Sequence, residues 1–253
     1  MSSSSIPGLV IKGFNPPLRL ADFKLLALDM DSTLINIECV DEIAAAAGRK
    51  AEVAAITEAA MRGEITDYKE SLRQRVALLE GVPVSALHEV YDRRLQLNPG
   101  AETLVRAAQA AGLRTLLVSG GFTFFTDRIR DRLGLDFTRS NVLGVHDGLL
   151  TGKMVDQPWG DICDGEEKKK MLLATCAQLH LDPRQAIHRR RRQRPADDGI
   201  GRAVSGLPRQ AQGARAGDGR DQRRWAGSSA RGGDPVDAAA SAARGFCCAS
   251  LAW

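Results

Sequence analysis

The chain has 253 residues and a formal net charge of +4 at pH 7. That length can bury one sizeable core together with a small subdomain. No apolar run approaches the roughly 18 residues that span a membrane, and the polar start Met1–Ser5 does not resemble a secretory signal. The five cysteines form no Cys-x-x-Cys pair. We therefore expect neither a zinc site nor a disulfide framework, and a reducing cytoplasm as the location.

The positive charge belongs to the end of the chain alone. Residues 1–187 carry 22 Lys and Arg against 25 Asp and Glu, whereas residues 188–253 carry 13 Arg against 6 Asp and no Lys or Glu. Clustered arginines attract nucleic-acid phosphates without sequence preference. Only Trp225, Phe246 and Trp253 are aromatic in this tail, and they do not alternate with the arginines. Nucleic-acid binding is therefore disfavoured as the function.

A buried strand and two aspartates follow a loose lead-in. Residues 1–24 are rich in Ser and Pro, with a short strand predicted at Leu9–Ile11. The apolar run that begins at Leu25 is typical of a strand buried on both faces of a parallel sheet. Residues i and i+2 of a strand point the same way, so Asp29 and Asp31 should project together from its carboxyl end. Two carboxylates this close favour a bound cation such as Mg²⁺ over a pair of solvated loop residues.

Four helical patterns separate this strand from the next one. They cover Val40–Ala47, Lys50–Arg62, a segment capped by Thr66 that ends near Gly81, and Val84–Leu95. Four consecutive short helices between two strands do not belong to a sheet layer. We therefore predict that residues 36–97 form an inserted helical cap.

The chain then returns to alternating helices and strands. The predicted elements are a helix at Ala101–Ala111, a strand at Leu113–Val118, a helix at Phe122–Leu133, a hairpin of Val142–Val145 with Leu149–Met154, a helix at Glu166–Leu179 and a strand that begins at Gln185. Between strand and helix, Ser119-Gly120-Gly121 offers a hydroxyl and unhindered N–H groups to a phosphate, although an ordinary turn would look the same. Residues 25–35 and 98–187 together form the predicted core domain.

These motifs, in this order, resemble the haloacid dehalogenase superfamily. Within it, the segments Glu38–Glu42 and Tyr68–Val76 of the predicted cap resemble the phosphoserine phosphatase family. The resemblance implies an α/β fold with a doubly wound parallel sheet and a small inserted helical cap. It also implies Mg²⁺-dependent hydrolysis of O-phosphoserine to serine, the last step of serine biosynthesis.

The resemblance implies a catalytic role for the two aspartates. Asp29 would attack phosphorus to form an aspartyl-phosphate, and Asp31 would act as general acid and base. Mg²⁺ would bind the Asp29 carboxylate and the Asp31 carbonyl. Lys168 would offset the charge between phosphate and Asp29, with Lys169 as the alternative.

The resemblance also implies a binding site for the substrate. Ser119 and the N–H of Gly120 would hold phosphate oxygens. Arg75 could bind the substrate carboxylate through a bidentate fork, and Glu38 could bind the ammonium. The simpler interpretations are a surface arginine and a glutamate at a helix start.

One motif of the family is absent. The family has Gly-Asp-Gly-x-Asn-Asp after the strand that begins at Gln185, and its first aspartate completes the magnesium site; this chain has Arg189–Gly199 instead. Consecutive CGN arginine codons, read one base later, encode only Val, Ala, Asp or Gly. Arg189–Gln193 thus permits Gly-Asp-Gly-Ala, and the next two steps permit Asn and Asp.

We therefore expect residues 188–253 to be an out-of-frame translation, with a disordered tail and a missing third metal ligand. An inactive product is one alternative to an active enzyme. A related phosphatase for another small phosphorylated amino compound is the other. The oligomeric state is left open.

Overall fold

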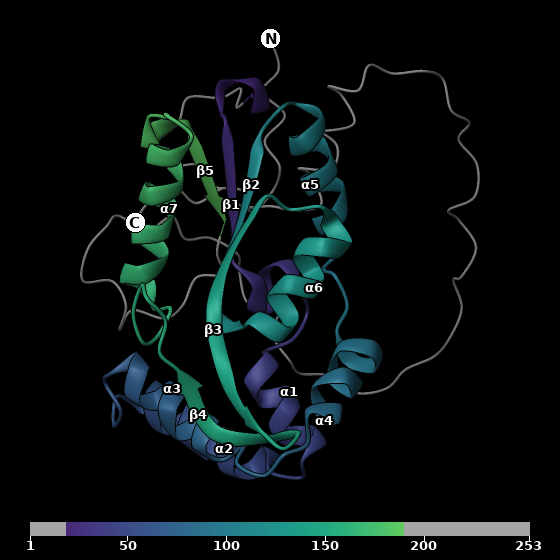
Figure 1. Cartoon of the computed structure of the whole chain (residues 1–253), viewed down its shortest axis with the longest axis vertical. Coiled ribbons are helices and arrows are strands. Elements are labelled where there is room, and N and C mark those ends of the chain that lie inside the picture. Colours follow the sequence, from purple (N-terminus) through teal and green to yellow (C-terminus); the bar gives the residue numbers. More distant parts are fainter. Residues whose placement is uncertain (1–18, 190–253) are drawn as a thin grey trace, which may run out of the picture.

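A mostly parallel sheet runs through the computed structural model, which describes residues 19–189 (Figure 1). The predicted strand Leu9–Ile11 and the predicted disordered tail from residue 190 lie outside the described residues. The strand order is β4-β3-β2-β1-β5. The strands are β1 (Leu25–Leu28), β2 (Arg114–Phe122), β3 (Phe137–His146), β4 (Leu149–Val155) and β5 (Ala186–Arg189). All neighbouring pairs are parallel except β3 with β4, so the predicted α/β class is confirmed.

Helices cover both faces of the sheet. On one face lie α5 (Ala101–Ala110) and α6 (Thr123–Leu133), and on the other lies α7 (Gly165–Gln178) (Figure 1). Leu26 and Leu28 of β1 join the hydrophobic cluster beneath α5 and α6, whereas Leu25 joins the cluster beneath α7. Burying a leucine side chain contributes about 1.5–3 kcal/mol. The apolar run that predicted β1 is continuous because both of its faces are covered.

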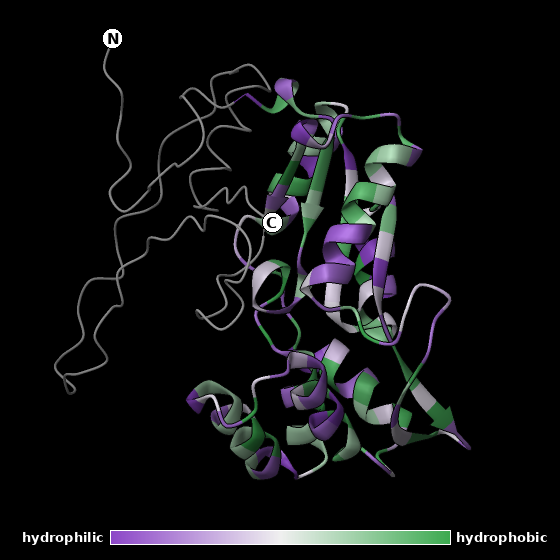
Figure 2. Ribbon diagram, turned by 90° about the vertical axis from the view of Figure 1, so that its left-hand side faces the viewer, coloured by the Kyte–Doolittle hydropathy of each residue, from purple (hydrophilic) through white to green (hydrophobic). Residues whose placement is uncertain are grey.

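A second group of helices lies beyond the carboxyl ends of the parallel strands, below the helix-covered part of the sheet in the side view (Figure 2). It consists of α1 (Cys39–Ala46), α2 (Lys50–Arg62), α3 (Tyr68–Ala77), α4 (Val84–Glu89) and a π-helical turn at Val90–Arg94. The range of α2 is as predicted. The prediction of Thr66 as the cap of α3 is wrong, because Asp67 accepts the Lys69 N–H at 2.9 Å.

The hairpin β3–β4 reaches these helices. The Leu150 N–H donates to the Val82 carbonyl and the Leu150 carbonyl accepts from Gly81, both at 2.8 Å. β3 pairs in parallel with β2 along its first part and antiparallel with β4 along its later part. The prediction included only the part that pairs with β4, so β3 begins at Phe137 and not at the predicted Val142. The division of the chain into core and cap stays a prediction.

The described residues also contain short helical turns. They are 3₁₀ turns at Leu20–Asp22 and Pro183–Gln185 and a π-like turn at Met30–Leu34. No helix within residues 19–189 is long and apolar enough to cross a lipid bilayer.

Candidate active site

Asp29 and Asp31 lie on a tight turn after β1. The strand ends at Leu28, so the prediction that the pair shares one face of a strand is wrong. Asp29 Oδ1 instead accepts the N–H of Met30 at 2.9 Å, and Ser32 has a left-handed φ of 51°. The turn still keeps the two carboxylates close, since the charge of Asp29 contributes to a raised pKa of Asp31. Such strained backbone is common at functional sites.

Lys168 forms an ion pair with the first of these aspartates. Its Nζ donates to Asp29 Oδ2 at 2.9 Å, and both side chains are only 14% exposed. Burial by itself lowers the pKa of Lys168, but the charge and hydrogen bond of Asp29, together with the nearby Tyr68 and Cys163, outweigh it and the net pKa is raised. Lys168 is held in the first turn of α7, where Asp164 Oδ1 accepts the Glu167 N–H at 2.9 Å. Of the two lysines predicted for this role, Lys168 is therefore the one in contact with Asp29.

Asp31 accepts two hydrogen bonds from Cys39, a residue for which the sequence predicted no role. The thiol of Cys39 donates to Asp31 Oδ1 at 3.2 Å, and the Cys39 N–H donates to Oδ2 at 3.4 Å. Burial first, and then the charges of Glu38 and Asp29, raise the pKa of Asp31 to about 7. A carboxyl group with such a pKa can both release and take up a proton near neutral pH.

The Ser119-Gly120-Gly121 segment is extended backbone at the end of β2. The strand continues to Phe122, so the predicted turn directly after Val118 is wrong. The Gly121 N–H donates to Ser119 Oγ at 2.9 Å. A Cβ at Gly121 would lie 3.2 Å from Asp31 Oδ2. Glycine is needed there because β2 passes directly beside the turn that carries Asp29 and Asp31.

A buried asparagine of β3 holds this segment in place. Asn141 Nδ2 donates to the Gly120 carbonyl at 2.7 Å, and its Oδ1 accepts the Cys163 N–H at 2.7 Å. Asn141 is 1% exposed. Its only sequence signal was a polar residue within a strand, which does not reveal a partner on another strand.

Helix α3 brings two side chains to the same region. A Cβ at Gly120 would lie 2.2 Å from the Tyr68 hydroxyl, so the Tyr68 ring covers Gly120. Burial raises the pKa of Tyr68 to about 12, while the charges of Lys168 and Arg75 act to lower it. Arg75 Nε donates to the Ser71 carbonyl at 3.3 Å. Tyr68 was part of a recognised motif, but no contact was predicted for it.

Glu38 is the N-cap residue of α1 and lies next to the turn that carries Asp29 and Asp31. Its Oε1 accepts the Ser32 hydroxyl at 2.5 Å. The structure thus brings the predicted site residues into one region; they are Asp29, Asp31, Glu38, Arg75, Ser119, Gly120 and Lys168. Their individual roles stay predictions.

Ion pairs join α3 to the loop before α7. Lys69 Nζ lies 2.8 Å from Asp161 Oδ1 and 3.7 Å from Asp164 Oδ2. Arg73 Nη2 lies 2.5 Å from Asp161 Oδ2. Because Asp164 also caps α7, these ion pairs link the start of α3, which carries Tyr68, to the start of α7, which carries Lys168.

The described residues supply only part of a magnesium site. Asp29 and Asp31 offer the hard oxygen donors that Mg²⁺ prefers. Within residues 19–189, however, no group of three His, Cys, Asp or Glu side chains is placed to hold a metal ion. Lys168 already contacts Asp29 Oδ2. The described residues therefore do not fit a complete metal centre.

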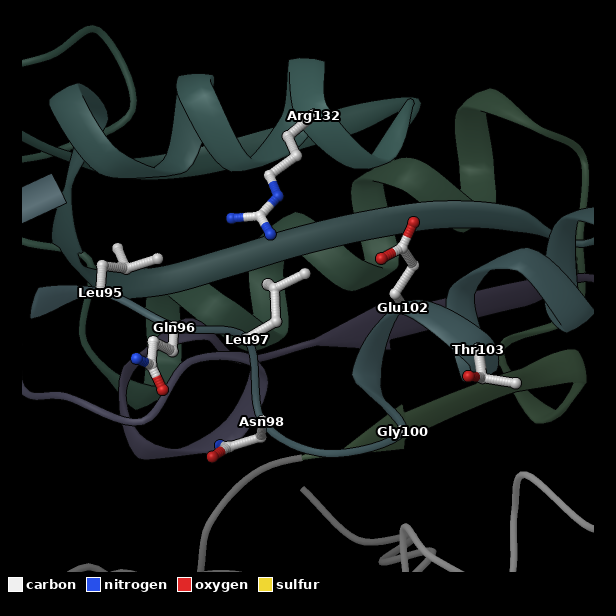
Figure 3. Close-up of a pocket in the computed structure, with 8 residues that line it drawn as sticks. All are labelled: Leu95, Gln96, Leu97, Asn98, Gly100, Glu102, Thr103 and Arg132. Carbon is white, nitrogen blue, oxygen red and sulfur yellow. The ribbon is translucent and has the colours of Figure 1, made fainter. Parts of the chain in front are cut away.

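A cavity of about 440 Å³ lies apart from these residues (Figure 3). It is lined by Leu95, Gln96, Leu97, Asn98, Gly100, Glu102, Thr103 and Arg132. Asn98 Nδ2 donates to the carbonyls of Thr33 and Ile35, at 2.8 and 2.9 Å, and so holds the chain that directly follows Asp31. None of the site residues lines this cavity, and we assign no ligand to it.

Comparison with known proteins gives consistent matches over most of the chain. Residues 26–187 match the family model of haloacid dehalogenase-like hydrolases. A phosphoserine phosphatase of Polaromonas sp. is 77% identical over 181 residues, which are 72% of this chain and 77% of that protein. One of Albidiferax ferrireducens is 73% identical over 181 residues, which are 72% of this chain and 76% of that protein.

A solved structure is similar as well. A substrate-bound phosphoserine phosphatase complex has a TM-score of 0.59 and 33% identity, covering 66% of this chain and 76% of that one. The family match ends at Ile187, directly before the segment in which the composition changes.

Proposed function

Because the chain belongs to the haloacid dehalogenase-like hydrolase family, we propose that its described residues form the active site of a phosphoserine phosphatase. This enzyme hydrolyses O-phospho-L-serine to L-serine and phosphate. The observation that carries the proposal is the 2.9 Å pair of Lys168 with Asp29 beside the half-buried Asp31, whose pKa is raised. It combines a nucleophile, a fixed positive charge and a proton donor.

The reaction proceeds in two steps on these side chains. Asp29 attacks phosphorus, the bond to the seryl oxygen breaks, and Asp31 gives its proton to that oxygen. Asp31 then takes a proton from water, which attacks the aspartyl-phosphate and releases phosphate. Lys168 stays protonated and opposes the negative charge that builds up between Asp29 and the phosphoryl group.

Binding groups lie on both sides of the reacting atoms. The Ser119 hydroxyl and the Gly120 N–H hold phosphate oxygens, since β2 presents both beside the catalytic turn. From the cap, Arg75 takes the substrate carboxylate and Glu38 takes its ammonium. The small zwitterionic head of phosphoserine matches this arrangement of charges.

We propose Mg²⁺ as the metal of the complete site. Asp29 and the main-chain carbonyl of Asp31 would hold it, and it would neutralise charge on the phosphate. The third carboxylate is not among the described residues, so the steps above rest on protein side chains alone. A cytoplasmic location is part of the same proposal.

The missing ligand is explained by a change of reading frame near His188. The family match ends at Ile187, and the printed tail from residue 188 has neither Lys nor Glu. An inactive product is therefore the second candidate for the printed chain. Resequencing the gene around codon 188 tests the frame: an intact frame through the arginine run in an independent isolate contradicts it.

Substrate preference tests the function itself. A chain with the frame restored after Ile187 should favour O-phospho-L-serine over phenyl phosphate by about 100-fold or more in kcat/KM, because only phosphoserine uses Arg75 and Glu38. Equal turnover of the two substrates would favour a less selective phosphatase, and a preference for phosphoethanolamine would favour another amino-phosphate.

A further inference from the structure

Within residues 19–189, Asp41 has one solvent-shielded carboxylate oxygen that makes no hydrogen bond. Asp41 lies in the first turn of α1, three residues after Glu38, which is the N-cap residue of that helix. The shielded oxygen is Oδ1. A shielded acceptor without a donor destabilises a fold unless a ligand supplies the donor.

Arg75 exerts the largest charge effect on this carboxylate. Burial raises the pKa of Asp41, Arg75 lowers it, and the weaker charges of Glu42 and Lys50 act in opposite directions. Asp41 and Arg75 nevertheless form no ion pair within the described chain, and Arg75 Nε bonds the Ser71 carbonyl. Glu42, the next residue, is paired with Arg94 at 3.1 Å. The Asp41 carboxylate and the Arg75 guanidinium thus lie near each other, while Asp41 Oδ1 makes no hydrogen bond within residues 19–189.

This arrangement fits the head group of an α-amino acid, in which ammonium and carboxylate share one carbon. We infer that Asp41 is a specificity-determining residue whose Oδ1 accepts an N–H of the substrate's α-ammonium while Arg75 binds the neighbouring carboxylate. Glu38 already uses one oxygen for the Ser32 hydroxyl, so a second acceptor satisfies a group that has three N–H donors. The inference rests on the proposed function and adds a residue to it.

Two ligands that differ at the ammonium test the inference. O-phospho-L-serine and 3-phosphoglycerate share a phosphate and a carboxylate, but the second has a hydroxyl in place of the ammonium. Their affinities for the full printed chain can be measured by calorimetry, with phosphate release followed in parallel so that any hydrolysis of phosphoserine is subtracted. Asp41→Asn should weaken phosphoserine binding about tenfold and leave 3-phosphoglycerate within about twofold. Glu42→Gln, on the same helical turn, should change neither.

The outcomes separate the inference from the proposed function. Unchanged phosphoserine binding by Asp41→Asn, or an equal loss for both ligands, overturns the role of Asp41 alone. If the unmodified chain binds neither ligand, the proposed function fails for this chain and the inference falls with it.

A measurement without ligand checks the premise. Asp41→Asn should raise the midpoint of thermal unfolding, because the variant no longer encloses an unpaired charge. Glu42→Gln should not raise the midpoint, because it breaks the ion pair of Glu42 with Arg94. A lower midpoint for Asp41→Asn would show that the carboxylate has a partner in the fold, which also overturns the inference.

Discussion

At the scale of single residues, the site depends on Gly120 having no side chain, because the Tyr68 hydroxyl occupies the space that a Cβ would fill. A Cβ at Gly120 would lie 2.2 Å from the Tyr68 hydroxyl but 3.4 Å from the carbon that bears it. Gly120→Ala should therefore lower the free energy of unfolding by about 1–3 kcal/mol. Adding Tyr68→Phe removes the clashing oxygen and should restore most of that loss in a urea-unfolding double-mutant cycle. Additive effects of the two substitutions would contradict the contact.

Lys168 and Lys169 form a matched pair for a second test. Lys168→Met leaves Asp29 mostly buried without its ion-pair partner and should lower the free energy of unfolding by roughly 1.5–3 kcal/mol. Lys169→Met, on the same helix, should change it by less than about 0.5 kcal/mol. Urea titrations of the two variants give the comparison. Equal effects would mean that the pair with Asp29 does not form.

The sequence predicted those site residues whose chemistry is carried by a local motif. Asp29 and Asp31 could be found because two carboxylates ended an apolar run. Tyr68, Cys39 and Asn141 act through atoms that the fold brings from other elements. No local pattern encodes such contacts, so their places could not be predicted.

At the scale of elements, α3 and the loop before α7 are joined by the ion pairs of Asp161. The bond from Lys69 is the main cause that lowers the pKa of Asp161 to about 2. A carboxyl whose folded pKa is depressed stabilises the fold above its unfolded pKa near 4 and loses that effect as pH falls towards 2. Because the side chains are about one-third exposed or more, the contribution should be only about 0.5–1 kcal/mol.

Asp161→Asn should accordingly lower the free energy of unfolding at pH 7, and the difference from the unmodified chain should shrink between about pH 4 and pH 2. The exposed Asp156→Asn in the same loop is the control. Denaturant midpoints across this pH range give the measurement. A difference that does not change with pH would show that Asp161 acts other than through its charge.

The elements themselves show which sequence signals are reliable. The continuous apolar run predicted β1, and Gly63 in the left-handed region ends α2 where expected. The extension of β2 to Phe122 was missed, since glycines suggested a turn while pairing with Asn141 of β3 keeps the backbone extended. The break of the fourth helix into a π-helical turn after Glu89 had no sequence signal.

At the scale of the whole molecule, β5 is the last strand within residues 19–189, and the family match ends inside it, at Ile187. It pairs with β1 at the edge of the sheet, with His188 opposite Ala27. His188 is 5% exposed, in a sheet whose other parallel strands are mostly apolar there. The frame change that we propose at about codon 188 would therefore alter the sheet from this position onward.

Metal binding tests that boundary. A chain with the restored frame should gain a third carboxylate, so saturating Mg²⁺ should raise its free energy of unfolding by about 2.7 kcal/mol at 100 times the dissociation constant. The printed chain should show no such shift, because the described residues hold no cluster of three metal ligands. Thermal unfolding with Mg²⁺ and with EDTA measures both. A similar shift in the printed chain would place the missing ligand within the printed sequence.

The most direct measurement is phosphate release from O-phospho-L-serine by the printed chain beside the frame-restored chain. We predict an ordinary turnover of about 1–10³ s⁻¹ for the restored chain and a rate at least about 100-fold lower for the printed one. Equal, robust turnover by both would contradict the claim that Asp29, Asp31 and Lys168 are only part of the catalytic site.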